Sequence, residues 1–117
     1  MLEEFLDKHH QHFDSDFVVV KIDTDQMDHG KEVASRIRKD PSGGIPWMVI
    51  LNSQGEEQVT SDGPNGNIGY PYQPAEIDHF MEMLTKTAKR STPEQLAAIK
   101  DQLTADAKKR QARQGQR

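Results

Sequence analysis

The sequence predicts a mixed α/β fold, because two strand-like runs alternate with amphipathic helical stretches. The run 47–51 is apolar and too short for a buried helix, and Pro46 before it suits the first residue of a strand that is covered on both faces. Turn-forming residues at 52–55 separate it from the polar run 56–61, so we expect an antiparallel hairpin with an edge strand. The β-branched run 17–23 is typical of a central strand in the same mixed sheet.

Mostly apolar side chains recur at helical spacing in four stretches. The first stretch begins at the start of the chain, and the second covers about residues 29–39, with Asp28 as its expected cap. Pro74 is typical of the first position of a helix, and Ser91 with Glu94 fits a capping box that starts the last helix. The stripe positions are Leu2, Phe5, Leu6, His9 and Phe13; Val33, Ala34 and Ile37; Ile77, Phe80, Met81 and Leu84; and Leu96, Ile99 and Leu103.

The expected order is α-β-α-β-β-α, followed by an extra C-terminal helix. We expect one domain over residues 1–89, and the last helix with a basic tail over residues 90–117. The tail from Lys108 to Arg117 holds five cations and no acid, which leaves 10 Lys and Arg against 19 Asp and Glu in the rest of the chain. An acidic body argues against nucleic acid as a partner. No signal peptide or membrane-spanning run is recognisable, so the default expectation is a soluble, cytoplasmic chain.

The chain contains no cysteine, so it has no thiolate nucleophile, disulfide or cysteine-based metal site. His9, His10 and His12 suggest a metal site, but only His9 and His12 share a helix face, and a solvated helix end explains them better. The acidic run 23–28 resembles the opening of a calcium loop but lacks its glycine and glutamate, and the glycine-rich stretch 62–69 lacks the lysine of a phosphate loop. We therefore expect no cofactor, no metal and no catalytic residues.

Two short motifs resemble the thioredoxin family over roughly residues 1–89: Val20-Lys21-Ile22-Asp23 at the end of one strand, and Gly44-Ile45-Pro46 at the start of the next. An Asn-Ser-Gln-Gly turn at 52–55 adds to the likeness. The resemblance implies a truncated thioredoxin-like domain that begins inside the second helix of that fold, with Leu2 matching an aliphatic residue after the redox motif. The first strand, first helix, second strand and Cys-x-x-Cys motif of a thiol-disulfide oxidoreductase are then missing, and the chain as given is redox-inactive.

The same resemblance implies a cis Ile45–Pro46 bond and a peptide-contact ledge formed by Gly44, Ile45, Pro46 and Trp47. Trp47 departs from the family, which commonly has threonine at this place. The loop 62–73 is expected at the same end of the sheet, beside Met1. Its residues on the ledge side are Gly66, Asn67, Gly69 and Tyr70.

Three functions remain open from the sequence. The chain is a redox-inactive part of an oxidoreductase, a non-catalytic module that binds an extended peptide or protein, or an assembly element completed by another chain. In the last case, the run 17–23 lacks its usual neighbour and pairs with 47–51, pairs with a second copy in a homodimer, or keeps an open edge. We expect closure or a dimer rather than an open edge, with Phe17, Val18 and Val20 as contact residues.

Overall fold

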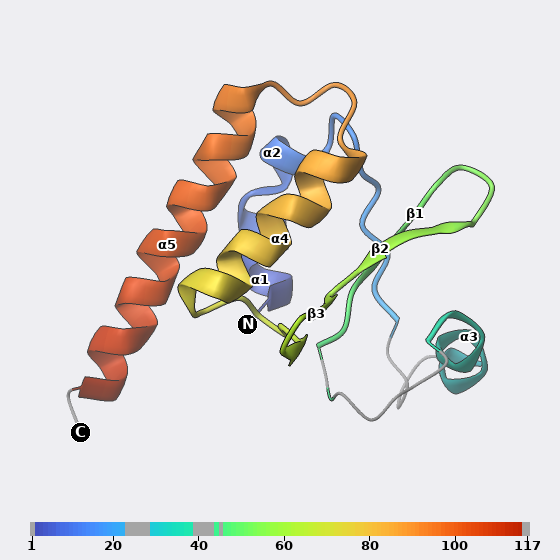
Figure 1. The fold of residues 1–117 in the computed structure, drawn as a ribbon, viewed down its shortest axis with the longest axis horizontal. Helices are drawn as coiled ribbons and strands as arrows, with labels where there is room; N and C mark the ends of the chain where they lie inside the picture. Colours follow the sequence, from blue (N-terminus) through green and yellow to red (C-terminus); the bar gives the residue numbers. More distant parts are fainter. Residues whose placement is uncertain (1, 23–28, 39–43, 45, 116–117) are drawn as a thin grey trace.

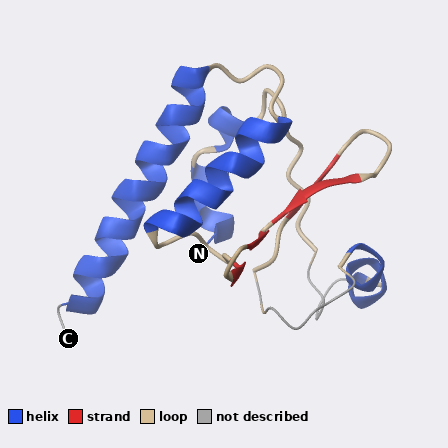
Figure 2. Ribbon diagram, in the orientation of Figure 1, coloured by secondary structure: helices blue, strands red, loops and turns tan. Residues whose placement is uncertain are grey.

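The computed structural model describes residues 2–22, 29–38, 44 and 46–115, with side chains to residue 113. Helices and short strands alternate along this part of the chain, and the mixed helix and strand content predicted from the sequence is confirmed (Figures 1 and 2). The elements are α1 (Leu2–Lys8), α2 (His10–Phe13), α3 (Gly30–Ile37), β1 (Val49–Leu51), β2 (Glu57–Thr60), β3 (Asp62–Gly63), β4 (Gly66–Asn67), α4 (Pro74–Thr87) and α5 (Pro93–Gly115).

The predicted hairpin is confirmed, since β1 and β2 pair antiparallel with Ile50 opposite Val59. Asn52 forms the turn: its Oδ1 accepts the backbone N–H groups of Gln54 at 3.0 Å and Glu56 at 2.9 Å. Gly55 takes a φ of 80°, a left-handed conformation that glycine adopts without steric cost. The stretch predicted as a long loop forms a second small hairpin, in which β3 pairs with β4.

The predicted strand at 17–23 is wrong over its described residues 17–22, which form no regular structure. In the part of the chain that the structure describes, no backbone hydrogen bond is made by residues 18–22. The side chains of Val18 and Val20 are 90% and 73% exposed. The described strands therefore form two separate two-stranded antiparallel sheets, and closure of the run against 47–51 does not occur. A β-branched run favours the extended state but needs a neighbouring strand to satisfy its backbone groups.

Four helices and one face of the hairpin enclose the core (Figure 1). Helix α5 packs against α4 and α2, and Met83, Ile99 and Leu103 are almost fully buried between them. Phe13 of α2 meets Phe80 of α4 edge to face, with ring centroids 6.4 Å apart. The core cluster consists of Phe5, Phe13, Ile68, Ile77, Phe80, Met83, Leu84, Ile99, Leu103 and Ala107. The predicted helical stripes account for most of this cluster.

Helix α4 starts as predicted, with Pro74 at its first turn and the Gln73 N–H donating to Glu76 Oε1 at 2.8 Å. The capping box of α5 lies one residue later than predicted. Thr92 Oγ1 accepts the Gln95 N–H at 3.2 Å, and Gln95 Oε1 accepts the Thr92 N–H at 2.9 Å. The Ser91–Glu94 assignment is therefore wrong.

Asp16 explains the displaced cap. Its Oδ2 accepts the Ser91 N–H at 2.7 Å and the Ser91 hydroxyl at 2.6 Å, so Ser91 is not free to cap α5. Its Oδ1 accepts the N–H groups of Lys89 and Arg90 at 2.9 and 2.8 Å. Four hydrogen bonds thus join the segment after α2 to the connection between α4 and α5, and we call this arrangement the Asp16 latch.

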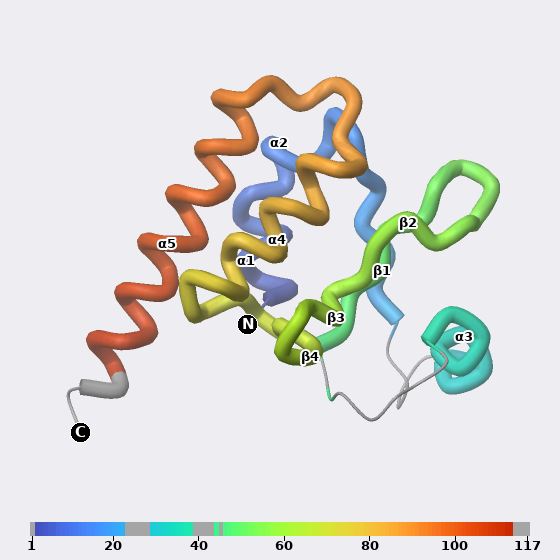
Figure 3. Tube along the Cα trace, in the orientation of Figure 1, coloured from blue at the N-terminus to red at the C-terminus, as the bar shows by residue number. Residues whose placement is uncertain are grey.

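The predicted helix over about 29–39 is observed as Gly30–Ile37, and its expected cap Asp28 lies outside the described residues. Helix α3 lies apart from α1, α2, α4 and α5, beyond the β1–β2 hairpin (Figure 3). The hairpin therefore stands between the helical core on one face and α3 on the other.

Candidate functional site

Asn67 joins two of the segments that the sequence placed at one site. Its Nδ2 donates to the carbonyl oxygens of Pro46 at 2.8 Å and Gly44 at 3.2 Å. Its Oδ1 accepts the Gly69 N–H at 3.2 Å. Gly69 lies next to the ledge, since a Cβ built on it would come to 3.8 Å from Pro46 Cδ. The structure therefore brings Gly44, Pro46, Asn67 and Gly69 together.

The buried Ser61 holds this junction in place through hydrogen bonds to Asn67 and Met48. It is 0% exposed, and its hydroxyl donates to Asn67 Oδ1 at 2.7 Å while accepting the Met48 N–H at 2.9 Å. Its own N–H donates to the Met48 carbonyl at 2.9 Å. A buried polar group with its hydrogen bonds satisfied fixes the geometry around it. Sequence reasoning missed Ser61, because a serine at the end of a polar strand carries no signal of burial.

Trp47 belongs to the opposite face of the hairpin from the core. Met48 and Ile50 pack against the core, and side chains alternate along a strand, so Trp47 and Leu51 face away from it. The Trp47 indole Nε1 donates to Asp62 Oδ2 at 3.0 Å. The guanidinium carbon of Arg38 lies 5.0 Å from the centre of the Trp47 ring, within cation–π range.

Arg38 connects α3 to the ledge. It follows the last residue of the helix in an extended conformation, and its Nη1 donates to the Gly44 carbonyl at 2.8 Å. The Gly44 carbonyl therefore accepts hydrogen bonds from both Arg38 and Asn67. Sequence reasoning missed Arg38 as well, since it lies nine positions before Trp47 in a different element.

An open groove of about 520 Å³ lies between the end of α3 and the outer face of the hairpin. Trp47, Leu51 and Thr60 line it from the hairpin, and Ile37 and Arg38 line it from the helix side. Leu51 is 41% exposed at this surface. Arg36, Glu57 and Asp62 line it as well, so the groove combines an aromatic ring and aliphatic side chains with charges of both signs.

The remaining predicted site residues either lie away from this junction or fall outside the described residues. Gly66 is exposed at the start of β4, with a φ of 106°. Tyr70 is directed to α5, where its hydroxyl donates to Asp106 Oδ2 at 2.5 Å and Arg110 covers its ring at 3.9 Å. Burial and the Asp106 carboxylate raise the pKa of the Tyr70 phenol. Ile45, its bond to Pro46, and Met1 lie outside the described residues.

The histidines of the first helical stretch form an aromatic contact. The rings of His9 and His12 stack with centroids 6.1 Å apart, and the His9 ring lies 4.6 Å from that of Phe5. Burial and the neighbouring Lys8 charge lower the pKa of His9. Over the described ranges, no three His, Cys, Asp or Glu side chains are grouped to hold a metal ion. The calcium-like run 23–28 lies outside these ranges.

None of the helices in the described part is long and apolar enough to cross a membrane.

Comparisons with protein-family models, with curated proteins and with solved structures found no match to this chain.

Proposed function

We propose that this chain is a non-catalytic, thioredoxin-like binding module that holds a partner polypeptide in the groove between α3 and the outer face of the hairpin. The observation that carries the proposal is the place of Trp47. The resemblance assigns Trp47 to a peptide-contact ledge, and its ring lines a groove of about 520 Å³. Large aromatic side chains in such grooves contribute much of the binding energy in protein interfaces.

Two further features support a binding role. The ledge is rigidly built, because Asn67, Ser61 and Arg38 hydrogen-bond to the backbone at Gly44, Pro46 and Met48. A preorganised site loses little conformational entropy on binding. In addition, β1 has a single described neighbour, so its other edge can accept an extended segment by strand addition.

The proposal excludes thiol-disulfide chemistry as the activity of this chain. That reaction transfers electrons through a thiolate, and the sequence holds no cysteine.

Selection of peptides tests the proposal. A display library of random 12-residue peptides is selected against the immobilised chain, and the dissociation constants of the selected peptides are measured by fluorescence polarisation. Trp47→Ala and Leu51→Lys are expected to weaken binding at least tenfold, because one removes the ring and the other places a charge in the groove. Tyr72→Ala, which removes an aromatic ring beside Arg110 and away from the groove, serves as the control. Binding that is unaffected by both groove variants, or no selected peptide at all, contradicts the proposal.

A second candidate function is assembly with another copy of the chain. The observation that favours it is the exposure of Val18 and Val20, which form an apolar extended run with no hydrogen-bonded neighbour among the described residues. Such a run is a template for pairing between chains. Sedimentation equilibrium is expected to give a dimer that Val18→Lys converts to a monomer, while Thr85→Lys on the exposed side of α4 leaves the dimer intact. A monomeric wild-type chain at high concentration ends this candidate.

A further inference from the structure

Two residues of α5 hold the loop that leads into the candidate site. Asp106 Oδ2 accepts the Tyr70 hydroxyl at 2.5 Å, and the guanidinium carbon of Arg110 lies 3.9 Å from the centre of the Tyr70 ring. Arg110 Nη2 donates to the Pro71 carbonyl, and Arg110 Nε forms an ion pair with Asp106 Oδ2 at 3.0 Å. We call Tyr70, Asp106 and Arg110 the α5 clamp.

The α5 clamp fixes the loop firmly, because its contacts are mostly shielded from water. The side chains of Arg110 and Asp106 are 22% and 33% exposed, and Pro71 is almost fully buried. Charged and hydrogen-bonded pairs are screened less by water and salt at such positions than at the open surface. A planar guanidinium can also stack on a ring and donate to a carbonyl at the same time.

A short chain of contacts leads from the clamp to the ledge. Gly69 directly precedes Tyr70, and its N–H donates to Asn67 Oδ1 at 3.2 Å. Asn67 Nδ2 in turn donates to the carbonyl oxygens of Pro46 and Gly44. One peptide unit and one side chain therefore connect the clamped residue to the backbone of the ledge.

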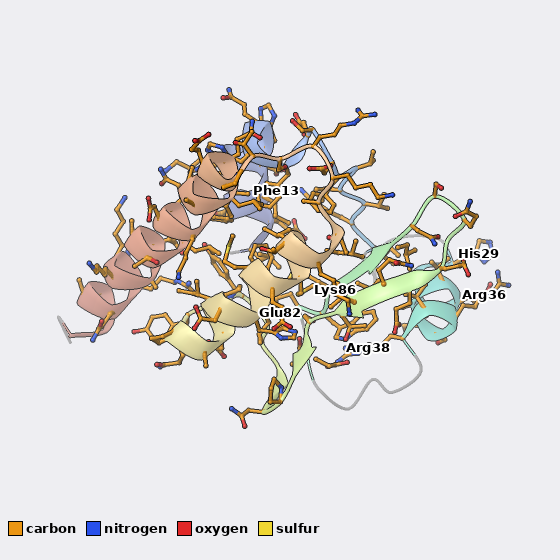
Figure 4. The ribbon with its side chains drawn as sticks, turned by 45° about the horizontal axis from the view of Figure 1, so that its top comes forward. Phe13, His29, Arg36, Arg38, Glu82 and Lys86 are labelled. Atoms are coloured by element: carbon orange, nitrogen blue, oxygen red, sulfur yellow. The ribbon has the colours of Figure 1, made fainter. Side chains whose placement is uncertain are left out.

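Helix α5 itself lies on the other side of α4 from the hairpin, as Figures 1 and 4 show. Arg38, which contacts the Gly44 carbonyl, is seen beside the strands of the hairpin in Figure 4. The loop is therefore the segment through which α5 can act on the ledge.

We propose that the α5 clamp positions the ledge: it fixes the loop that carries Asn67, and Asn67 fixes the backbone at Gly44 and Pro46. The clamp residues are positioning residues, since none of them lines the groove beside Trp47. The effect of the clamp on partner binding rests on the proposed function, whereas its effect on the conformation of the ledge does not.

A clamp that only attached α5 to the body would behave differently. Ile99 and Leu103 already bury α5 in the core, and Arg110 reaches past its own helix to the loop. Loss of a simple attachment lowers the free energy of unfolding but leaves the surroundings of Trp47 in the folded chain unchanged. Loss of a positioning contact changes those surroundings as well.

The test measures the emission of Trp47, the single tryptophan, and its quenching by acrylamide in the folded chain without denaturant. Arg110→Gln is expected to shift both, because the loop is released from α5 and Asn67 loses its fixed place. Lys109→Gln is the matched control, since Lys109 is the exposed neighbour on the same helix and the substitution removes the same charge. It is expected to shift neither.

Tyr70→Phe keeps the aromatic ring and removes only the hydroxyl that Asp106 accepts. It is expected to shift the emission in the same direction as Arg110→Gln, but by less. Circular dichroism checks that each variant is folded, and Tyr70→Phe decides the test if Arg110→Gln does not fold.

A double variant tests the route through Asn67. In the Asn67→Ala background the ledge is already released, so Arg110→Gln is expected to add no further shift in the emission of Trp47. Additive shifts, unchanged emission in the clamp variants, or an equal shift in Lys109→Gln would each overturn the proposal.

Peptides selected against the wild-type chain connect the clamp to binding. Arg110→Gln is expected to weaken their binding about threefold or more, and Lys109→Gln to leave it unchanged. A shifted emission with unchanged affinity contradicts a role of the clamp in binding. Failure to select any peptide contradicts the proposed function, whereas unshifted emission contradicts the clamp, so the two failures are distinguishable.

Discussion

The Asp16 latch predicts that a single substitution, Asp16→Asn, lowers the free energy of unfolding. Burial alone would raise the pKa of the Asp16 carboxyl, but hydrogen bonds from the Ser91 hydroxyl and from the backbone at 89–91 outweigh it and lower the pKa from 3.8 to about 2. Each pKa unit corresponds to about 1.36 kcal/mol, but solvent screens a carboxyl this close to the surface, so we expect the latch to contribute roughly 1 kcal/mol to the free energy of unfolding when Asp16 is ionised. Asp16→Asn replaces one acceptor oxygen by an NH₂ group that faces N–H donors, so we expect it to remove about this amount at pH 7.

The direction of the pKa shift determines how the stabilisation by Asp16 depends on pH. The folded pKa lies below the unfolded one, so the stabilisation is fully present above about pH 4 and is lost as the pH falls through about 2. The difference between wild type and Asp16→Asn should therefore shrink over this range.

Urea unfolding followed by circular dichroism at pH 7, 5, 4 and 3 measures this difference. Asp14→Asn is the matched control, because Asp14 lies two residues away and pairs with His10 where both side chains are more than half exposed. We expect the control to change the free energy of unfolding by less than about 0.5 kcal/mol. The reasoning about the latch fails if the two substitutions have equal effects at pH 7, or if the effect of Asp16→Asn does not decline with pH.

Three further predictions follow from the core, the ledge and the composition. Asn67→Ala removes the hydrogen bonds to the Pro46 and Gly44 carbonyls; we expect a loss of about 2 kcal/mol in urea unfolding together with a shift in Trp47 emission, and an unchanged emission would contradict the role of Asn67 as the support of the ledge. Leu103→Ala leaves a cavity at a fully buried position and should cost about 3 kcal/mol, whereas Leu51→Ala, at a partly exposed position, should cost less than about 1 kcal/mol. The chain should not accelerate the reduction of insulin disulfides above a buffer control, because it carries no thiol; measurable turnover by the pure protein would refute this.

The elements that the sequence predicted correctly are those whose hydrogen bonds are local. The hairpin follows from Asn52 and Gly55 acting within four residues of each other, and α4 follows from Pro74 and a stripe of apolar positions. The cap of α5 was misplaced by one residue because Ser91 has two alternative partners. The helix would use it as a cap, but Asp16, 75 positions away in sequence, takes its hydroxyl instead.

The residues of the candidate site also fall into two groups: those that the sequence indicated and those that only the structure revealed. The sequence, through the family resemblance, indicated Gly44, Pro46, Trp47, Asn67 and Gly69, and the structure brings four of these into one hydrogen-bonded and packed junction beside Trp47. It did not indicate Ser61 or Arg38, because the burial of the first and the contact of the second with Gly44 arise from packing between separate elements. Tyr70 was assigned to the ledge side, but its ring packs against α5.

The sequence by itself determined the helical stripes, the hairpin and the absence of thiolate chemistry, since each depends on residue type and on spacing along a few turns of chain. Only the tertiary structure decided what becomes of residues 17–22. Their composition is that of a buried strand, but a strand is defined by hydrogen bonds to another segment, and no described segment lies in position to supply them. The same run is therefore left without regular structure, and Val18 and Val20 are exposed.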